Sequence, residues 1–414
     1  MAPSEVLPLD LNCLSIHELE LLARERMDKQ TRDYYNEGAD DGSTLAENQH
    51  AYTKYRIRPR VLRDVSIIDT TVNVFDQQNA APFGIAPTAM QRLAHSEGEL
   101  ATARACAKAG IVMGLSSFST STLEDVKEAS GENANALQLY LFEEKNHSIK
   151  LINRAKKAGY KAVLLTVDTP YLGRRNLELR NQFKLPAHLK IANFSENADD
   201  EEEVKDAVGS PEDSISQQST KKTAQAKKSA AGYLDNNKRV VPTGPITFHT
   251  HAPNPTLSWE DSIPWLKEVA HPMQVWVKGI ATHEDALLAL HHKVDGIIVS
   301  NHGGRQLNGA LATLDALPDV VDGVRGRCPV HVDGGIRHGT DIFKALALGA
   351  DFVWVGRPAL WGLAYKGEEG VALALRLLMD EFRLCMSLAG VTKVSDITKD
   401  YLVKMNRDGF VSKL

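Results

Sequence analysis

The sequence predicts a closed parallel (β/α)8 barrel, the TIM-barrel fold, and three observations carry this prediction. Eight short apolar runs alternate with amphipathic helical stretches between about residues 82 and 388. Polar and glycine residues follow these runs directly, and in such a barrel the loops after the strands gather at one face. The length of 414 residues fits one barrel of typical size plus extensions.

The predicted elements follow one another in regular β/α order. The strands are Phe83–Ala86, Ile111–Leu115, Leu137–Leu141, Ala162–Val167, Val275–Gly279, Gly296–Ser300, Pro329–Val332 and Phe352–Val355. The helices between them are Gly98–Lys108, Leu123–Ala129, Ile149–Ala158, Ser262–Val269, Glu284–His291, Leu314–Val324 and Asp341–Leu348. A long series of β/α units is typical of a closed barrel.

Three segments complete the predicted organisation around a barrel over residues 81–390. Residues 1–80 form an N-terminal helical extension that packs on the barrel, with Ser15 and Glu18 spaced as a helix capping box and a later stretch covering the N-terminal end. Residues 195–239, after the fourth strand, hold an acidic run and a Ser/Gln/Lys-rich stretch. This composition buries too little apolar surface to offset chain entropy, so we expect a mobile insertion. Residues 391–414 form a C-terminal tail.

Composition excludes several functional classes. Charged residues make up 24% of the chain and no run of 18 apolar residues occurs, so we expect a soluble protein without a membrane span. The net charge of -5 and the lack of a basic stripe argue against a nucleic-acid partner. The four cysteines lack C-x-x-C spacing, which indicates reduced thiols and no metal site.

The two ends of the chain suggest a location. Residues 1–10 lack the charged and apolar regions of a signal peptide. The chain ends in Ser412-Lys413-Leu414, the tripeptide that the peroxisomal import receptor reads at a free C-terminus. We therefore expect a protein of the peroxisomal matrix.

The ends of the last two predicted strands indicate a phosphorylated ligand. Gly334 and Gly335 let backbone N–H groups approach an anion, and Arg337 and Arg357 can add charge-assisted hydrogen bonds. A phosphate site after strands seven and eight occurs in many barrels. A tight turn without a ligand would explain either glycine alone, but the two loops together favour phosphate binding.

His302 is the candidate catalytic base because it follows the sixth predicted strand directly. It would face Asp168 across the barrel mouth, and an Asp that binds one ring nitrogen leaves the other free to take a proton. Arg175 and Arg305 could hold a carboxylate in bidentate fashion. Lys278 would place a positive charge beside an anion formed on a bound ring system.

Several motifs of the chain resemble one known family, the FMN-dependent 2-hydroxy-acid oxidases and dehydrogenases. The string from Ser300 to Leu307, SNHGGRQL, is the most specific. The others are DYYNEGA at 33–39, APTAM at 86–90, QLY at 138–140, LTVD at 165–168, LGRR at 172–175 and DGGIR at 333–337.

The resemblance implies a role for each matching residue. His302 would take a proton from the substrate while Asp168 orients and stabilises it. The substrate would be bound by Tyr34, Arg175 and Arg305 at its carboxylate, by Tyr140 at its hydroxyl, and by the walls Phe118 and Leu172. FMN would be held by Thr88, Ala89, Ser116, Gln138, Thr166, Lys278 and Ser300 at the ring and ribityl chain, and by Asp333, Gly335, Arg337, Gly356 and Arg357 towards the phosphate.

The implied activity is oxidation of an L-2-hydroxy acid to a 2-oxo acid, with dioxygen reduced to hydrogen peroxide by a homotetramer or larger assembly. Phe118 stands where glycolate oxidases have tryptophan, so we expect a larger substrate than glycolate, such as lactate, a longer aliphatic acid or mandelate. Three alternatives stay open. They are a decarboxylating lactate monooxygenase, because that group is also extended after strand four, a dehydrogenase with another electron acceptor, and a non-catalytic FMN-binding protein.

Overall fold

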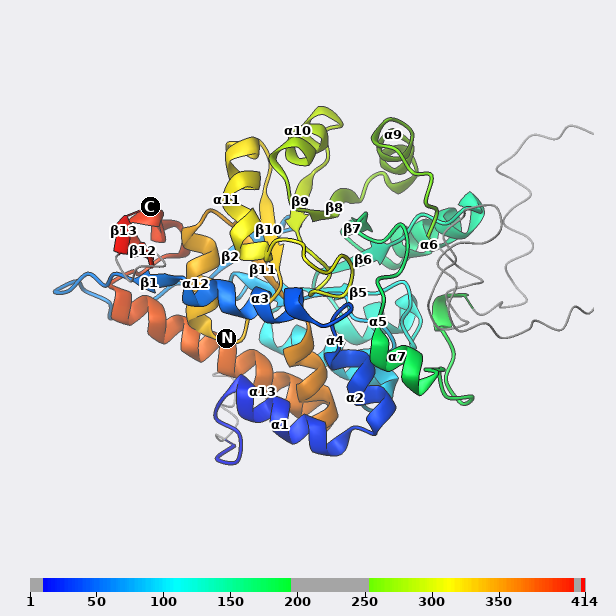
Figure 1. The fold of residues 1–414 in the computed structure, drawn as a ribbon, viewed down its shortest axis with the longest axis horizontal. Coiled ribbons are helices and arrows are strands. Elements are labelled where there is room, and N and C mark those ends of the chain that lie inside the picture. The colour runs from blue at the N-terminus through cyan, green and yellow to red at the C-terminus, as the bar shows by residue number, and fades with distance from the viewer. Residues whose placement is uncertain (1–9, 195–252, 406–410, 414) are drawn as a thin grey trace, which may run out of the picture. The chain divides into compact units, whose positions relative to one another are not determined.

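The structure, a computed structural model, describes residues 10–194, 253–405 and 411–413 (Figure 1). The described residues of the segments 1–193 and 243–414 belong to one compact unit. The insertion predicted at 195–239 and its expected mobility lie outside the described residues, as does Leu414 of the C-terminal tripeptide.

Eight parallel strands form the closed barrel, which confirms the predicted fold. The barrel strands are β4 (Phe83–Ile85), β5 (Met113–Leu115), β6 (Asn135–Leu139), β7 (Ala162–Thr166), β8 (Gln274–Ile280), β9 (Gly296–Val299), β10 (Val330–Asp333) and β11 (Phe352–Val355). The barrel closes where β11 pairs with β4, with Val353 opposite Phe83. Nearly every strand residue is buried, as expected for parallel strands covered on both faces, and this explains why the sequence shows continuous apolar runs.

Helices surround these strands (Figure 1). They are α4 (Gly98–Ala109), α5 (Leu123–Ser130), α6 (Lys145–Ala158), α9 (Trp259–Ala270), α10 (His283–His291), α11 (Thr313–Val324), α12 (Gly339–Ala347) and α13 (Arg357–Ala389). Shorter helical segments are α7 (Asn176–Asn181) and the 3-10 turns η1 (Gln91–Leu93), η2 (Ala192–Phe194), η4 (Val394–Asp396) and η5 (Lys399–Tyr401). The predicted helices did not include α13, whose interior glycines weaken the helical signal and whose backbone breaks at Lys366 and Gly367.

Three of the surrounding helices begin with the same N-cap pattern, a Ser or Thr hydroxyl followed three residues later by Asp. The hydroxyl groups of Thr122, Ser258 and Thr282 accept hydrogen bonds of 3.1–3.2 Å from the backbone N–H three residues later. In each case that later residue is an aspartate, whose negative charge also suits a helix N-terminus. Each cap contributes about 1 kcal/mol, so the helix starts after β5, β7 and β8 are fixed locally.

The N-terminal extension holds three helices, where the sequence predicted one helix and a polar segment. They are α1 (Ile16–Arg26), α2 (Lys29–Asn36) and α3 (Ser43–Thr53). The predicted cap of α1 is present, because Ser15 Oγ accepts from the Glu18 N–H at 3.1 Å. The second and third helices were missed because their residues are mostly polar, and their few buried side chains face the barrel.

Two small sheets complete the described chain. The hairpin of β2 (Val72–Val74) and β3 (Gln77–Asn79) places Phe75 edge-on against Trp276, with ring centroids 5.4 Å apart. Because Asp76 also accepts from Gln274, the first residue of β8, the hairpin lies at the N-terminal end of the barrel. The other sheet pairs β1 (Tyr55–Ile57) with β12 (Leu402–Met405), and β12 with β13 (Val411–Lys413).

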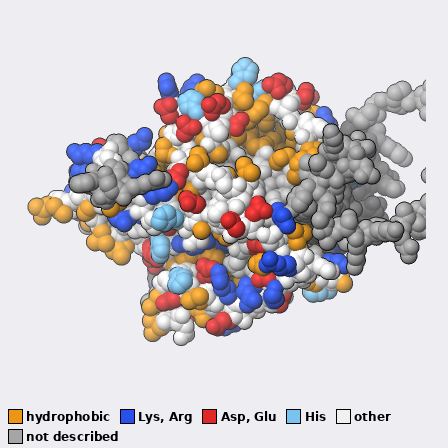
Figure 2. All heavy atoms as spheres, in the orientation of Figure 1, with side chains coloured by type: hydrophobic (Ala, Val, Ile, Leu, Met, Phe, Trp, Pro, Cys, Tyr) orange, Lys and Arg blue, Asp and Glu red, His pale blue; other side chains and the backbone are white. Residues whose placement is uncertain are grey.

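Acidic and basic side chains are interspersed on the face shown in Figure 2. Across the described residues, no helix has both the length and the apolar character that a membrane crossing requires.

Candidate active site

A cavity that is partly open to solvent lies where the barrel strands end. All of the predicted site residues except Asp168 and Ser300 line this cavity, and those two contact residues that do. Several lining residues were not predicted from the sequence, including Tyr35, Gly303, Trp354 and Leu360. The structure therefore brings together residues that eight separate strand ends supply, which is the arrangement that gives such barrels their sites.

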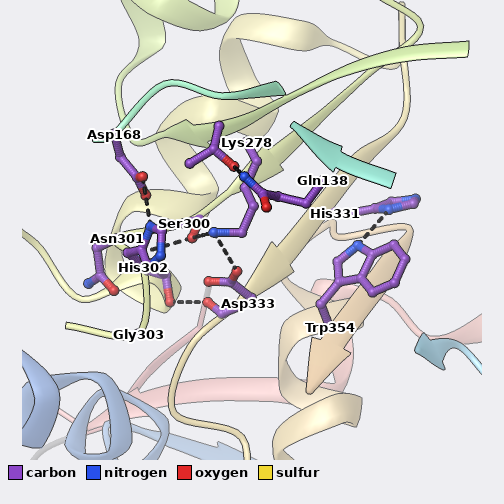
Figure 3. A network of polar contacts seen from close by, with 12 residues as sticks. Gln138, Asp168, Lys278, Ser300, Asn301, His302, Gly303, His331, Asp333 and Trp354 are labelled. Carbon is purple, nitrogen blue, oxygen red and sulfur yellow. Dashed lines mark hydrogen bonds and ion pairs between the residues drawn. The ribbon is translucent and has the colours of Figure 1, made fainter. Parts of the chain in front are cut away.

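His302 and Asp168 form a close pair (Figure 3). His302 Nδ1 lies 2.9 Å from Asp168 Oδ1, and the backbone N–H of His302 donates to Ser300 Oγ at 3.0 Å. His302 has a φ of 59°, a left-handed conformation that is uncommon for a residue other than glycine. This backbone conformation belongs to the loop that follows β9, so the ring is positioned by the loop as well as by Asp168.

The protonation states of this pair suit a base. Burial lowers the pKa of His302 below its ordinary value, and the Asp168 carboxylate only partly offsets this effect. Burial would raise the pKa of Asp168, but its interaction with His302 and the positive charge of Lys278 outweigh this effect and lower that pKa to about 2. Asp168 is thus an acceptor, so neutral His302 donates its Nδ1–H to it and leaves Nε2 free to take a proton.

Thr169 extends the pair, although the sequence analysis did not select it. Its Oγ1 lies 2.9 Å from Asp168 Oδ1 and 3.3 Å from His302 Nδ1. Burial raises the pKa of Tyr140, which keeps this phenol protonated and able to donate. The only sequence signal for Thr169 is its place directly after Asp168.

Arg175 and Arg305 lie together with a buried carboxylate between them. Glu178 Oε1 is 3.3 Å from Arg175 Nη1 and 3.2 Å from Arg305 Nη2. The Arg305 guanidinium lies 5.0 Å from the ring centroid of Tyr34, close enough for a cation–π contact. The arginines and Tyr34 thus form a cationic corner of the cavity, and Glu178 is a member that the sequence analysis missed.

Phe118 and Leu172 form an apolar wall. Phe118 is only 2% exposed, and its ring centroid lies 5.7 Å from that of Tyr140. It also meets Phe142 edge-on at 6.4 Å. These contacts hold the Phe118 ring from two sides, so the wall is fixed before any ligand enters.

Lys278 lies in the middle of a polar network (Figure 3). Its Nζ donates to Ser300 Oγ at 2.9 Å and forms an ion pair of 3.4 Å with Asp333. Burial would lower the pKa of Lys278, but the charges of Asp333 and Asp168 raise it overall, so Lys278 is a cation. On the neighbouring strands Gln138 Nε2 donates to Thr166 Oγ1 at 3.1 Å, so a row of donors and acceptors faces the cavity.

The other end of the cavity lies between the loops after β10 and β11. Gly335 packs so closely on α3 that an added Cβ would lie 2.0 Å from the Asn48 carbonyl oxygen. Arg337 lies over the Trp361 ring at 4.7 Å. Arg357, predicted to bind phosphate, donates to the carbonyl oxygens of Tyr35, Gly303 and Glu37 at 2.8–3.1 Å. Arg357 therefore ties three backbone segments together while its guanidinium lines the cavity.

Unpartnered buried atoms gather at this cavity. Among the described residues, six buried side-chain nitrogen or oxygen atoms lack a hydrogen-bond partner. Four of them belong to the site, namely Asp168 Oδ2, Arg175 Nε, Asp333 Oδ1 and Arg337 Nε. Because burying such atoms unpaired is costly, these positions indicate where a polar ligand binds.

The unpartnered atoms also test whether the site fits FMN. Asp333 Oδ1 can accept from ribityl hydroxyls, Arg337 Nε can donate to a phosphate, and the Gly335 loop offers backbone at close approach. The donor set thus fits a phosphorylated ligand that carries hydroxyl groups. The described residues contain no group of three or more His, Cys, Asp or Glu side chains that could hold a metal ion.

Comparison with known proteins places these features in a family. The family model described as FMN-dependent dehydrogenase matches residues 23–404. The chain is 43% identical to 2-hydroxyacid oxidase 1 of Mus musculus over 396 residues, 96% of this chain and 97% of the relative. It is 44% identical to Oxidase FUB9 of Gibberella moniliformis, over 95% and 92% of the two chains.

Further comparisons agree with this result. Glycolate oxidase 1 of Zea mays is 42% identical over 94% of this chain and 95% of the relative. A solved structure of mandelate oxidase with (S)-4-hydroxymandelic acid superposes with a TM-score of 0.77 at 35% identity, covering 93% of this chain and 97% of that one.

Proposed function

The chain belongs to the FMN-dependent dehydrogenase family, and from this premise we propose that it oxidises 2-hydroxy acids to 2-oxo acids. The observation that carries the proposal is the position of a neutral histidine, paired with an ionised aspartate, beside two arginines that can hold a carboxylate. A 2-hydroxy acid needs both elements, a base for its proton and a cationic partner for its carboxylate.

Different residues of the site bind the substrate and accept its proton. Arg175 Nε, which has no partner within the described chain, and Arg305 bind the substrate carboxylate, while Tyr140 donates to or accepts from the substrate hydroxyl. His302 Nε2 takes one proton, and Asp168 stabilises the imidazolium that results. His302 is the base in either case, whether the proton comes from the substrate hydroxyl or from C2.

FMN, when bound, supplies the acceptor for the two electrons that leave the substrate. Lys278 would hold a positive charge at the ring, with Thr88, Ala89, Ser116, Gln138, Thr166 and Ser300 around the ring and ribityl chain. Asp333, Gly335, Arg337, Gly356 and Arg357 would hold the ribityl chain and phosphate.

The apolar wall supports a substrate larger than glycolate. Phe118 and Leu172 present only carbon atoms of their side chains to the cavity, so a methyl, alkyl or phenyl group on C2 would be desolvated there. Lactate, a longer aliphatic 2-hydroxy acid and mandelate are the substrates we propose.

Dioxygen is the electron acceptor we propose, with hydrogen peroxide as product. A peroxisomal location through the import receptor is proposed from the tripeptide Ser412-Lys413-Leu414. A homotetramer or larger assembly is proposed from the family resemblance. The lactate monooxygenase alternative differs in its product, because lactate would then give acetate in place of pyruvate and peroxide.

The deciding experiment mixes the purified flavoprotein anaerobically with L- and D-2-hydroxy acids and follows the flavin absorbance, then admits air and assays peroxide. Rapid bleaching by an L-acid, followed by reoxidation with stoichiometric peroxide, is expected. Slow reoxidation would point to a dehydrogenase with another acceptor. No bleaching by any acid would overturn the proposed function, and highest kcat/KM for glycolate would overturn the proposed substrate size.

A further inference from the structure

Glu178 is a buried carboxylate whose position suggests a role in substrate choice. It is the third residue of α7 and is 7% exposed. One oxygen, Oε1, serves as the acceptor for both arginines of the cationic corner, at 3.3 Å from Arg175 and 3.2 Å from Arg305. A single oxygen shared between two guanidinium groups leaves most of their N–H donors for other partners.

The backbone of Glu178 is fixed by a second carboxylate. Glu37 accepts the backbone N–H of Leu177 at 2.5 Å and that of Glu178 at 3.1 Å. Glu37 therefore caps the first turn of α7 and holds Glu178 against the arginines. The two glutamates have different tasks, because the Glu37 carboxylate binds backbone and the Glu178 carboxylate binds guanidinium groups.

The charges of Arg175, Arg305 and Glu178 sum to one positive charge. Burial lowers the pKa of Arg305 and the charge of Arg175 lowers it further, while Glu178 and, more weakly, Glu37 oppose both effects. The two guanidinium groups therefore repel one another, and the carboxylate cancels one of their two charges. Lys278 does not add to the corner, because its charge is paired with Asp333. One net positive charge is left, which balances one substrate carboxylate.

We propose that Glu178 is a specificity-determining residue that restricts the site to 2-hydroxy acids with a single carboxylate. A second carboxylate on the substrate would find the corner already neutral and would meet the carbon wall of Phe118 and Leu172. The inference rests on the proposed function, and it concerns which members of that substrate class bind.

The test compares how tightly the flavin-loaded protein binds an anion with one carboxylate and an anion with two. Acetate and malonate are titrated separately, and their dissociation constants are read from the perturbation of the flavin spectrum, without turnover. Glu178→Gln keeps the shape and removes the charge, so malonate should gain affinity relative to acetate by on the order of tenfold. Glu178→Ser removes the charge with a different side chain and should shift the ratio in the same direction.

Two variants serve as controls. Glu178→Asp keeps the charge and should keep the wild-type ratio, even if both anions bind more weakly. Glu368→Gln removes a carboxylate that also bridges two cations, Arg104 at 2.5 Å and Lys108 at 2.6 Å, neither of which lines the cavity, and it should leave the ratio unchanged.

A wild-type ratio in both Glu178→Gln and Glu178→Ser would overturn the inference, and so would an equal shift in Glu368→Gln. The parallel kinetic test follows flavin reduction by L-lactate and L-malate, where Glu178→Gln should raise the malate-to-lactate ratio of kcat/KM. Failure of every 2-hydroxy acid to reduce the wild-type flavin would instead count against the proposed function, because the anion titrations do not depend on turnover.

Discussion

Asn48 and Asn301 exchange two hydrogen bonds through their side-chain amides, each 2.8 Å long. Asn48 lies on α3 of the N-terminal extension, and Asn301 directly precedes His302 in the loop after β9. Both are buried, and Asn301 also accepts from the Gly304 N–H at 3.0 Å. The pair therefore fixes the loop in which His302 takes its left-handed backbone conformation.

Replacing Asn48 should weaken both stability and catalysis. Asn48→Ala removes both hydrogen bonds to Asn301 and the acceptor of the buried Thr313 N–H, so we expect a loss of about 1–3 kcal/mol in the free energy of unfolding. The rate of flavin reduction should fall because His302 loses its fixed orientation. Denaturant unfolding and anaerobic mixing measure the two effects. Asn176→Ala, which removes one exposed hydrogen bond to Asp40, is the control and should change little.

His302→Gln should retain the flavin and lose turnover. The substitution removes the proton acceptor but keeps a polar side chain at the cavity, so we expect flavin reduction to slow by roughly 10²–10⁴-fold. Absorbance of the purified variant reports the bound flavin, and rapid mixing reports the rate. Near-normal reduction with full flavin content would rule out His302 as the base.

The pH dependence of kcat/KM should show a plateau at neutral pH and an acid limb. The base must be neutral, and burial lowers the pKa of His302 below 6.5, so activity falls only as the pH drops through that lowered pKa. In Asp168→Asn the carboxylate that raises this pKa is lost, so the limb should move to lower pH and the plateau should fall. The rate of flavin reduction, measured by rapid mixing over a pH series, tests the position of the limb in the wild type and its shift in the variant. A limb that moves to higher pH would contradict the assignment.

Gly279→Ala should disturb Asp168. Gly279 has a φ of 115° and lies at a register shift between β8 and β9, and an added Cβ would lie 2.7 Å from Asp168 Cβ. We expect reduced stability and slower flavin reduction, because Asp168 must move away from His302. Thermal unfolding and rapid mixing are the measurements. Gly309→Ala is the control, because it also places alanine at positive φ but its added Cβ would have no atom within 4 Å. A larger loss in Gly279→Ala than in Gly309→Ala would therefore report the displacement of Asp168 and not backbone strain alone.

His331 should make stability depend on pH. It is buried among aromatic rings, and burial lowers its pKa to about 3, so the folded state stays neutral where the unfolded state takes up a proton. Stability should therefore fall as the pH drops below the ordinary pKa of about 6.5.

His331→Asn removes this effect and keeps an acceptor for Trp354 Nε1, which donates to His331 at 3.1 Å. Between about pH 6 and pH 5 the free energy of unfolding should fall less in the variant, by roughly 1 kcal/mol per pH unit. Denaturant unfolding at several pH values measures the two slopes. Equal slopes would mean that His331 takes up a proton in the folded state.

The sequence predicted the barrel because its strands are buried on both faces and therefore read as continuous apolar runs. Site residues such as His302 and Lys278 were predictable because they follow those strands or lie near their C-terminal ends. Glu178 was not, because its significance comes from two arginines that only the fold brings to it. Asn48 was missed for the same reason, since its partner is far along the chain and a lone polar residue on a helix carries no sequence signal.

The pairing of β11 with β4 has a consequence for biosynthesis. Val353 lies opposite Phe83, so the first barrel strand, β4, cannot complete its pairing until the last, β11, has been synthesised. A nascent chain leaving the ribosome therefore carries an open sheet edge along β4 for most of its translation, and unpaired edges promote aggregation. Contacts between such distant segments also slow folding. We therefore expect this chain to need chaperone protection until β11 has been synthesised.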